Sequence, residues 1–283
     1  MKKKADKTKL KIVILSIILG LSLVAMIGLS AAYIVNLNNN RQGQAFYASL
    51  SVDVVPSFAP QPIIHETNTG VEELPRERII DDPALPEPEP FVPAMDFDEL
   101  RESIPDIVGW ILSEGTPINY PLVQTDDNSF YLTHLPDKSQ NNLGSVFLDY
   151  RNNADFSDTN IFIYGHNTTS GTMFGTLKNY TDQQYFDAHD VVQIFTPYNN
   201  FDVQLFAGYL LDSRYEHPPL GFVGETDFDE YIDDLKSRTF LQSDVQVSYG
   251  DTIVFLCTCQ EGTRGEARSM RRVLVGKLVD MGD

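Results

Sequence analysis

The chain opens with a long apolar segment. Residues 12–35 contain no charged side chain, and they exceed the roughly 20 residues that a helix needs to cross a bilayer. Six lysines precede them within residues 1–11, and basic residues favour the cytoplasmic side. We therefore expect a cytoplasmic basic tail over 1–11 and a transmembrane helix over 12–35. This makes a single-pass plasma-membrane protein whose remainder is extracellular. The alternative is a cleaved signal peptide with a small-residue site at Ser30-Ala31-Ala32, but its apolar core would normally span about 7–15 residues.

The next segment has no sustained hydrophobic period. Residues 36–95 contain nine of the sixteen prolines of the chain, and the Glu-Pro-Glu-Pro run lies near their end. Proline-rich and like-charged sequence favours an extended chain. We therefore expect an extracellular, acidic, Pro-rich linker over 36–95.

Beyond residue 95 the apolar positions fall into short runs rich in Val, Ile, Phe and Tyr, which is typical of strands. About 188 residues suffice for one domain with its own core, so 96–283 is predicted to be a single catalytic domain. Many strands with few helices favour a β-barrel or sandwich over a doubly wound sheet. The predicted strands cover 108–112, 118–123, 145–150, 160–164, 191–196, 202–211, 251–259 and 271–279.

Two helices are predicted within this domain. Asp96 and Glu99 form a capping pair before the apolar positions of the first helix, which ends at Pro105. The second covers 226–240, where Thr226 and Asp229 give a capping signal and the apolar residues follow helical spacing.

Charge and ligand spacing exclude several functions. The formal net charge is −19; the first eleven residues carry +5, so the remainder carries −24, and we expect no nucleic-acid partner. Cys257 and Cys259 are too far apart along one strand face to pair easily, so both are predicted to be free thiols. The five histidines show no metal-ligand spacing. We expect neither a metal nor an organic cofactor.

Three side chains at strand edges point to acyl transfer. Cys259 ends a buried strand, His166 follows another, and Arg271 opens a third. Together they can supply a nucleophile, a proton donor and an oxyanion partner, the requirements for a thioester intermediate. The sequence leaves the arginine open, because Arg264, Arg268, Arg271 and Arg272 all follow the cysteine closely.

Several motifs in a fixed order then identify a family. The chain resembles the class B sortases, membrane-anchored cysteine transpeptidases of Gram-positive bacteria, over about residues 96–279. The motifs are Val-Gly-Trp-Ile at 108–111, Asn-Tyr-Pro-Leu-Val-Gln at 119–124, Phe-Tyr-Leu-Thr-His at 130–134, Gly-Ser-Val-Phe-Leu-Asp-Tyr-Arg-Asn at 144–152, Ile-Tyr-Gly-His-Asn at 163–167, Met-Phe-Gly at 173–175 and Leu-Cys-Thr-Cys at 256–259.

The resemblance implies a mainly β fold, a closed eight-stranded barrel with short helices and an N-terminal helical extension. It also implies roles for Cys259 as nucleophile, His166 as proton donor to the leaving amine and Arg271 as oxyanion partner. Counting back from Gly276-Lys277 selects Arg271, and strand alternation places it on one face with Val273 and Val275.

Three further positions are expected to line the substrate site. Cys257 stands where the family often has serine, on the strand face of Cys259, and it is predicted not to be the nucleophile. Gln260 replaces a commonly acidic residue. Thr258 is the third position, although its side chain should point away as a strand residue.

The resemblance implies cleavage of a C-terminal sorting signal, of the Asn-Pro-x-Thr type in class B enzymes, in secreted proteins. The acyl group would pass to an amine of lipid II or peptidoglycan. Three alternatives stay open: a pilin-polymerising sortase, a hydrolytic thiol peptidase, and a non-catalytic anchored surface-binding module.

Overall fold

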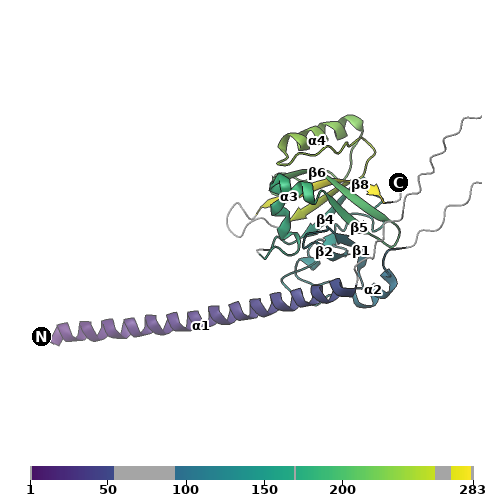
Figure 1. Ribbon diagram of the computed structural model, residues 1–283. Helices are drawn as coiled ribbons and strands as arrows, with labels where there is room; N and C mark the ends of the chain where they lie inside the picture. The colour runs from purple at the N-terminus through teal and green to yellow at the C-terminus, as the bar shows by residue number, and fades with distance from the viewer. Residues whose placement is uncertain (1, 54–92, 169, 259–268, 282–283) are drawn as a thin grey trace, which may run out of the picture.

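The computed structural model describes residues 2–53, 93–168, 170–258 and 269–281. A helix of 52 residues, α1 (Lys2–Asp53), leads into a β-barrel head (Figure 1). The short helix α2 (Phe97–Ser103) follows, capped by Asp96, whose carboxylate accepts from the backbone N–H groups of Asp98 and Glu99. This confirms the predicted Asp96 cap.

Eight strands close into a barrel in the order β1-β2-β3-β4-β7-β8-β6-β5, which confirms the predicted fold class. The bounds are β1 (Ile107–Leu112), β2 (Asn119–Val123), β3 (Val146–Leu148), β4 (Asn160–Gly165), β5 (Val191–Phe195), β6 (Asn200–Asp212), β7 (Ile253–Thr258) and β8 (Met270–Asp280). The short helices between them are η1 (Phe130–Leu132), η2 (Phe174–Thr181), α3 (Gln183–Ala188) and α4 (Glu225–Arg238).

The strands alternate between two apolar layers. Residues such as Val254, Leu256 and Leu274 fill the main core, whereas Phe255 and Val275 belong to a second cluster that also contains the buried face of α4. In Figure 1 this helix lies across the outside of the barrel beside β6. The barrel is therefore a packed core with one outer face covered by α4.

The start of α4 differs from the predicted capping signal. The helix begins at Glu225 after Gly224, which provides no side-chain cap. Thr226 and Asp229 both lie within the helix. The carboxylate of Asp227 instead accepts from the backbone N–H of Val223 at 3.0 Å, so a first-turn aspartate ties the helix to the preceding loop.

Residues 36–53, predicted as linker, are helical. They continue α1 without interruption, because the first proline after the apolar segment is Pro56 and no proline breaks the backbone hydrogen bonds before it. Helix α1 also packs on the head: Tyr47 is buried in the main core cluster, with Phe46 and Leu50 beside it. The rest of the predicted linker, 54–92, lies outside the described residues.

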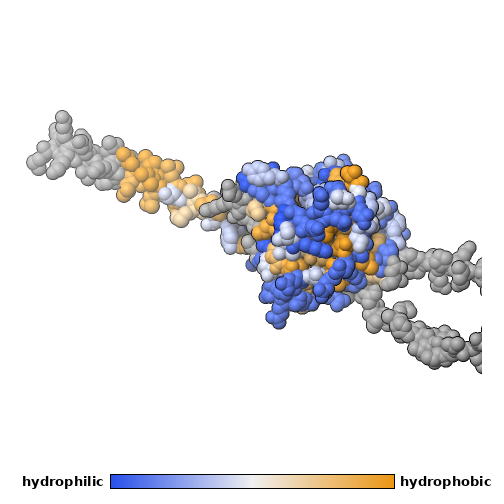
Figure 2. Space-filling model, turned by 90° about the horizontal axis from the view of Figure 1, so that it is seen from above, coloured by the Kyte–Doolittle hydropathy of each residue, from blue (hydrophilic) through white to orange (hydrophobic). Residues whose placement is uncertain are grey.

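Helix α1 carries the one described segment that is long and apolar enough to cross a membrane, Ile14–Leu50 with a mean hydropathy of 2.4 in its most apolar window. Its large apolar side chains from Ile14 to Val35 are exposed. Figure 2 shows them as a hydrophobic band on the helix, separate from the largely hydrophilic head. This composition is compatible with the predicted membrane anchor.

Candidate active site

Three neighbouring strands place the chain neighbours of the three predicted catalytic residues at one edge of the barrel. Strand β4 pairs with β7 in parallel, with Gly165 opposite Thr258. Strand β8 pairs with β7 on the other side in antiparallel register, and the Thr258 hydroxyl accepts from the backbone N–H of Arg272 at 2.8 Å. Gly165, Thr258 and Arg272 therefore lie side by side. His166 and Arg271 are the chain neighbours of the outer two.

The alternation of side chains along β4 and β8 places His166 and Arg271 on the same face of the sheet. Phe162 on β4, Phe255 on β7 and Val273 on β8 all belong to the cluster covered by α4. Positions 166 and 271 have the same parity as Phe162 and Val273 on their strands, so they belong to the same face. The structure supports the predicted face of Arg271.

His166 is held by the backbone of a loop far away in sequence. Its Nε2 atom lies 2.6 Å from the carbonyl oxygen of Leu132, at the end of η1. A carbonyl oxygen only accepts, so Nε2 carries the proton of this hydrogen bond. Any acid–base work of the imidazole then falls to Nδ1.

Gly144 forms one wall of the His166 ring. Its φ of +64° lies in the left-handed region. A Cβ built on it would lie 2.8 Å from Cδ2 of His166 and 2.9 Å from the carbonyl oxygen of Leu132. The absence of a side chain at 144 therefore lets the imidazole approach its carbonyl partner.

Arg271 and Arg272 have different surroundings. Arg271 is partly buried at the start of β8, and its Nη1 donates to the Met270 carbonyl at 3.0 Å. Arg272 is 8% exposed, and its guanidinium lies 5.4 Å from the ring centroid of Phe240. This packing removes Arg272 from the face of His166 and leaves Arg271 as the arginine of β8 that belongs to this face.

Cys259 and Gln260, with Arg264 and Arg268, lie outside the described residues. Cys259 follows Thr258 directly, and consecutive Cα atoms are about 3.8 Å apart. The predicted nucleophile is therefore bonded to the residue that joins β4 to β8.

Thr258 is a correction to the predicted substrate site. Its side chain is 1% exposed, and its hydroxyl is engaged with the Arg272 backbone. The side chain points into the barrel because β7 alternates, so it joins two strands and contributes no surface to a substrate.

Cys257 is a buried cysteine. It lies in the cluster under α4, with Sγ 3.9 Å from the Phe255 carbonyl oxygen. Its backbone pairs with Tyr164 on β4 and Val273 on β8. Its exposed fraction of 5% favours a packing role over substrate contact.

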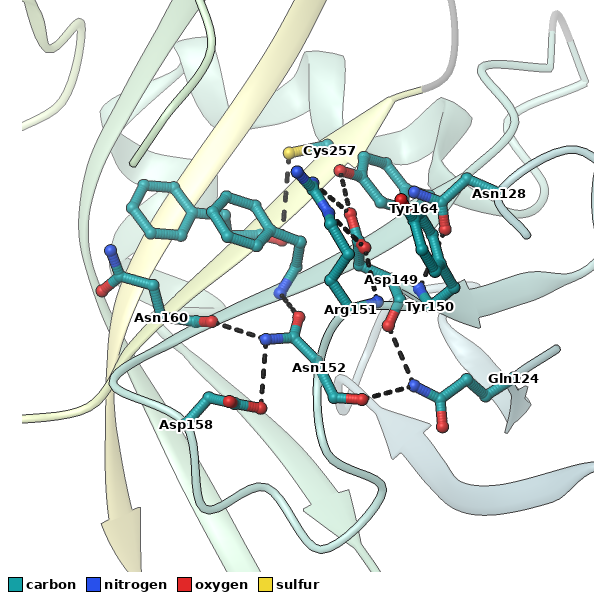
Figure 3. Close-up of polar contacts among 12 residues, drawn as sticks. Gln124, Asn128, Asp149, Tyr150, Arg151, Asn152, Asp158, Asn160, Tyr164 and Cys257 are labelled. Carbon is teal, nitrogen blue, oxygen red and sulfur yellow. Dashed lines mark hydrogen bonds and ion pairs between the residues drawn. The ribbon is translucent and has the colours of Figure 1, made fainter. Parts of the chain in front are cut away.

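The sequence reasoning missed a polar network beside Cys257. Asp149 is fully buried and accepts two hydrogen bonds from the Arg151 side chain, at 2.9 and 2.7 Å, and one from the Tyr164 hydroxyl at 3.0 Å. Figure 3 shows Asp149, Arg151 and Tyr164 grouped next to Cys257. Asp149 and Arg151 both belong to the sequence motif at 144–152, and this motif was the signal from which the network could have been predicted.

The same motif is anchored by amides. The Gln124 side chain donates to the backbone carbonyls of Asp149 and Asn152 at 2.9 and 2.7 Å, and the Asn152 side chain accepts from the Phe162 N–H of β4 at 2.8 Å (Figure 3). Strand β3 ends at Leu148, earlier than the predicted 150, because Asp149 begins this hydrogen-bonded turn.

Asp149 has a stability consequence that depends on pH. Burial alone would raise its pKa, but hydrogen bonds from Arg151 and Tyr164 outweigh burial and hold the pKa below the usual aspartate range. A lowered folded pKa adds stability above the unfolded pKa of about 4, and that stability is lost as pH falls through the folded value. Asp149→Asn should lower the unfolding free energy by about 2 kcal/mol at pH 7.

Thermal unfolding of the full chain at pH 7 and pH 3 measures this effect. The difference in unfolding free energy between the wild type and Asp149→Asn should be smaller at pH 3 than at pH 7. Asp98→Asn is the control, since its ion pair with Arg101 is exposed and exposed pairs contribute about 0–1 kcal/mol. A deficit that is equal at both pH values would contradict the role given to the carboxylate.

Comparison with known proteins agrees with the fold. No protein-family model matches. The chain is 37% identical over 185 residues to Sortase B of Listeria monocytogenes, covering 64% of this chain and 74% of the relative. It is 30% identical over 183 residues to Sortase B of Staphylococcus aureus, covering 65% and 74%.

Solved structures give the same result. The Staphylococcus aureus sortase B–substrate complex has a TM-score of 0.62 at 30% identity, covering 65% of this chain and 85% of that chain. Sortase B from Listeria monocytogenes has a TM-score of 0.56 at 34% identity, covering 64% and 99%. The fold and the relatives define a sortase transpeptidase. Within that class, the chain belongs to the sortase B family.

Proposed function

We propose that this sortase cleaves a C-terminal sorting signal of secreted proteins after a threonine and joins the new carboxyl end to a cell-wall precursor amine. The observation that carries the proposal is the side-by-side placement of Gly165, Thr258 and Arg272. His166, Cys259 and Arg271 are the chain neighbours of those three residues.

In the first half-reaction, the proton of the Cys259 thiol passes to Nδ1 of His166, and the resulting thiolate Sγ attacks the threonine carbonyl carbon. A C–S bond forms, and the carbonyl oxygen gains negative charge that the Arg271 guanidinium stabilises. The C–N bond then breaks, and Nδ1 of His166 gives its proton to the leaving amine. The product is a thioester acyl-enzyme.

In the second half-reaction, an acceptor amine attacks the thioester carbon. His166 takes a proton from the amine through Nδ1, the C–S bond breaks, and a new amide forms. The Leu132 carbonyl keeps the proton of the ring on Nε2 throughout. None of these steps requires a metal or an organic cofactor.

Two related structures support the proposed classes of substrate and acceptor. One matching structure is a Staphylococcus aureus sortase B–substrate complex, and another is a sortase B complexed with triglycine. For this chain we propose a sorting signal of the Asn-Pro-x-Thr type and an amine of lipid II or peptidoglycan. We also propose that residues 12–35 anchor the enzyme in the plasma membrane, with 1–11 cytoplasmic and the head outside.

Product analysis tests the proposed reaction. The full chain in detergent is incubated with an Asn-Pro-x-Thr peptide and triglycine, and products are separated by mass. We expect cleavage after threonine and a threonine–triglycine conjugate as the main product. Predominant hydrolysis with triglycine in excess would instead indicate a thiol peptidase, and preference for a lysine side-chain amine would indicate pilin polymerisation. Absence of Cys259-dependent cleavage of any sorting peptide would favour a binding module.

A further inference from the structure

Helix α1 reaches into the surroundings of His166 through Tyr47. This tyrosine is 7% exposed, and its hydroxyl donates to the Gly144 carbonyl at 2.7 Å. Gly144 is the residue on which a Cβ would lie 2.8 Å from Cδ2 of His166. One hydrogen bond therefore links the end of the membrane-directed helix to the wall of the imidazole.

A second contact leads from Tyr47 to the other side of His166. The rings of Tyr47 and Tyr120 meet edge to face, with centroids 5.2 Å apart. The Tyr120 hydroxyl accepts from the Met173 N–H at 2.9 Å, and Met173 pairs with Asn167, the residue after His166. Tyr47 thus supports both the segment that packs on the imidazole and the turn that follows it.

The helix is itself fixed to the same loop. Asn39 accepts hydrogen bonds at 2.8 Å from the Asn141 side chain and from the Asn142 backbone. Gly43 allows the close approach, because a Cβ there would lie 3.0 Å from both Asn141 Oδ1 and Leu143 Cδ2. At about 1.5 Å per residue, Tyr47 lies about 18 Å along the helix from Val35.

We propose that Tyr47 is a positioning residue for His166, so that the docked end of α1 orients the imidazole. The inference rests on the proposed function for its catalytic consequence. Tyr47 touches neither substrate nor reacting atoms; it holds Gly144 and, through Tyr120, the 167–173 turn. Together these set where Nδ1 points while Nε2 stays on Leu132.

The test is Tyr47→Phe in the full chain in lipid nanodiscs, which keeps the ring and removes the hydrogen bond. Since small misplacements of a reacting group cost one to two orders of magnitude in rate, kcat should fall about tenfold, with KM changed less than about twofold. The NMR signals of the His166 ring should shift in the resting enzyme. The chemical shift of the Nε2 proton should decrease, because its hydrogen bond to the Leu132 carbonyl weakens. Tyr198→Phe, at an exposed tyrosine, should leave kcat and these signals unchanged.

A second variant removes the docking without touching Tyr47. Gly43→Leu should push the helix away from Asn141 and Leu143 and reproduce the kcat loss and the His166 shifts. Gly28→Leu lies on the same helix with no atom within 4 Å and should change neither.

Unchanged kcat and His166 signals in Tyr47→Phe, with only a lower melting temperature, would overturn the positioning role. Failure of the proposed function is a separate result: the wild-type enzyme would then lack Cys259-dependent turnover. The resting NMR signals would still decide whether Tyr47 orients the imidazole.

Discussion

Cys259→Ala should abolish cleavage and transfer of a sorting peptide, whereas Cys257→Ser should retain most of the activity. The two thiols are two residues apart: Cys257 is a buried member of the cluster under α4, and Cys259 is the predicted nucleophile. Removing the attacking atom removes the thioester route, a loss on the order of 10⁶-fold in kcat for nucleophiles of this kind. The measurement is steady-state turnover with a fluorogenic sorting peptide.

Cys257→Ser has its own expected signature. The hydroxyl places a polar group among Phe255 and Val273, and an imperfectly paired polar group in that cluster costs about 1–3 kcal/mol of stability. The melting temperature should therefore fall more than kcat. Equal loss of turnover in both variants, with both folded, would contradict the assignment of Cys259 as sole nucleophile.

Arg271→Lys should reduce kcat/KM by about 10²-fold, because loss of one oxyanion donor costs about 3 kcal/mol of transition-state stabilisation. Lysine keeps the charge but not the planar fork of donors. Arg271 is the second residue of β8 and lies on the face of His166, two residues before Val273. Peptide turnover over a range of concentrations separates kcat from KM, and the loss should fall mainly on kcat.

Two arginine variants serve as controls for this prediction. If Arg271 is the oxyanion donor, Arg268→Lys, which preserves the charge, should retain activity within about threefold. Arg272→Lys should act on stability, because the Arg272 guanidinium packs on Phe240. If Arg271→Lys behaved like Arg268→Lys, the oxyanion role would belong to another group.

The barrel could be predicted because its strands are short, apolar and bounded by turn residues, and because the order of motifs is specific. Boundaries were less accurate where hydrogen bonds compete with the hydrophobic pattern. At β3, Asp149 takes the chain into a turn with Arg151. At α4, Asp227 ties Val223 to the first turn, which a capping signal at Thr226 does not anticipate.

Helix α1 shows why the linker boundary was wrong. Residues 36–53 lack the apolar period of an isolated helix, so the sequence suggests a stalk. Tertiary contacts decide the structure there. Asn39 accepts hydrogen bonds from the Asn141 side chain and the Asn142 backbone N–H, and Tyr47 is buried in the main core. A catalytic unit that begins at residue 96 lacks this part of the core.

The sequence predicts the site as three residue types at three strand ends, but it does not predict the contacts that support His166 in the structure. The Leu132 carbonyl on His166 and the Tyr47 hydroxyl on Gly144 are long-range contacts between a side chain and a backbone carbonyl. The sequence pattern does not indicate which backbone carbonyl will accept a hydrogen bond from the His166 or Tyr47 side chain. Thr258 shows the converse, because its motif position suggested substrate contact while strand alternation buried it.

The most direct test is to locate the acyl group on the trapped enzyme. The full chain is mixed with a sorting peptide without an acceptor amine, quenched in acid and digested with trypsin. Both cysteines fall in the one peptide between Arg238 and Arg264, so fragment ions must separate residue 257 from residue 259. The account predicts the threonyl adduct on Cys259 and its disappearance in His166→Ala. An adduct on Cys257, or steady turnover with no adduct on either sulfur, would contradict it.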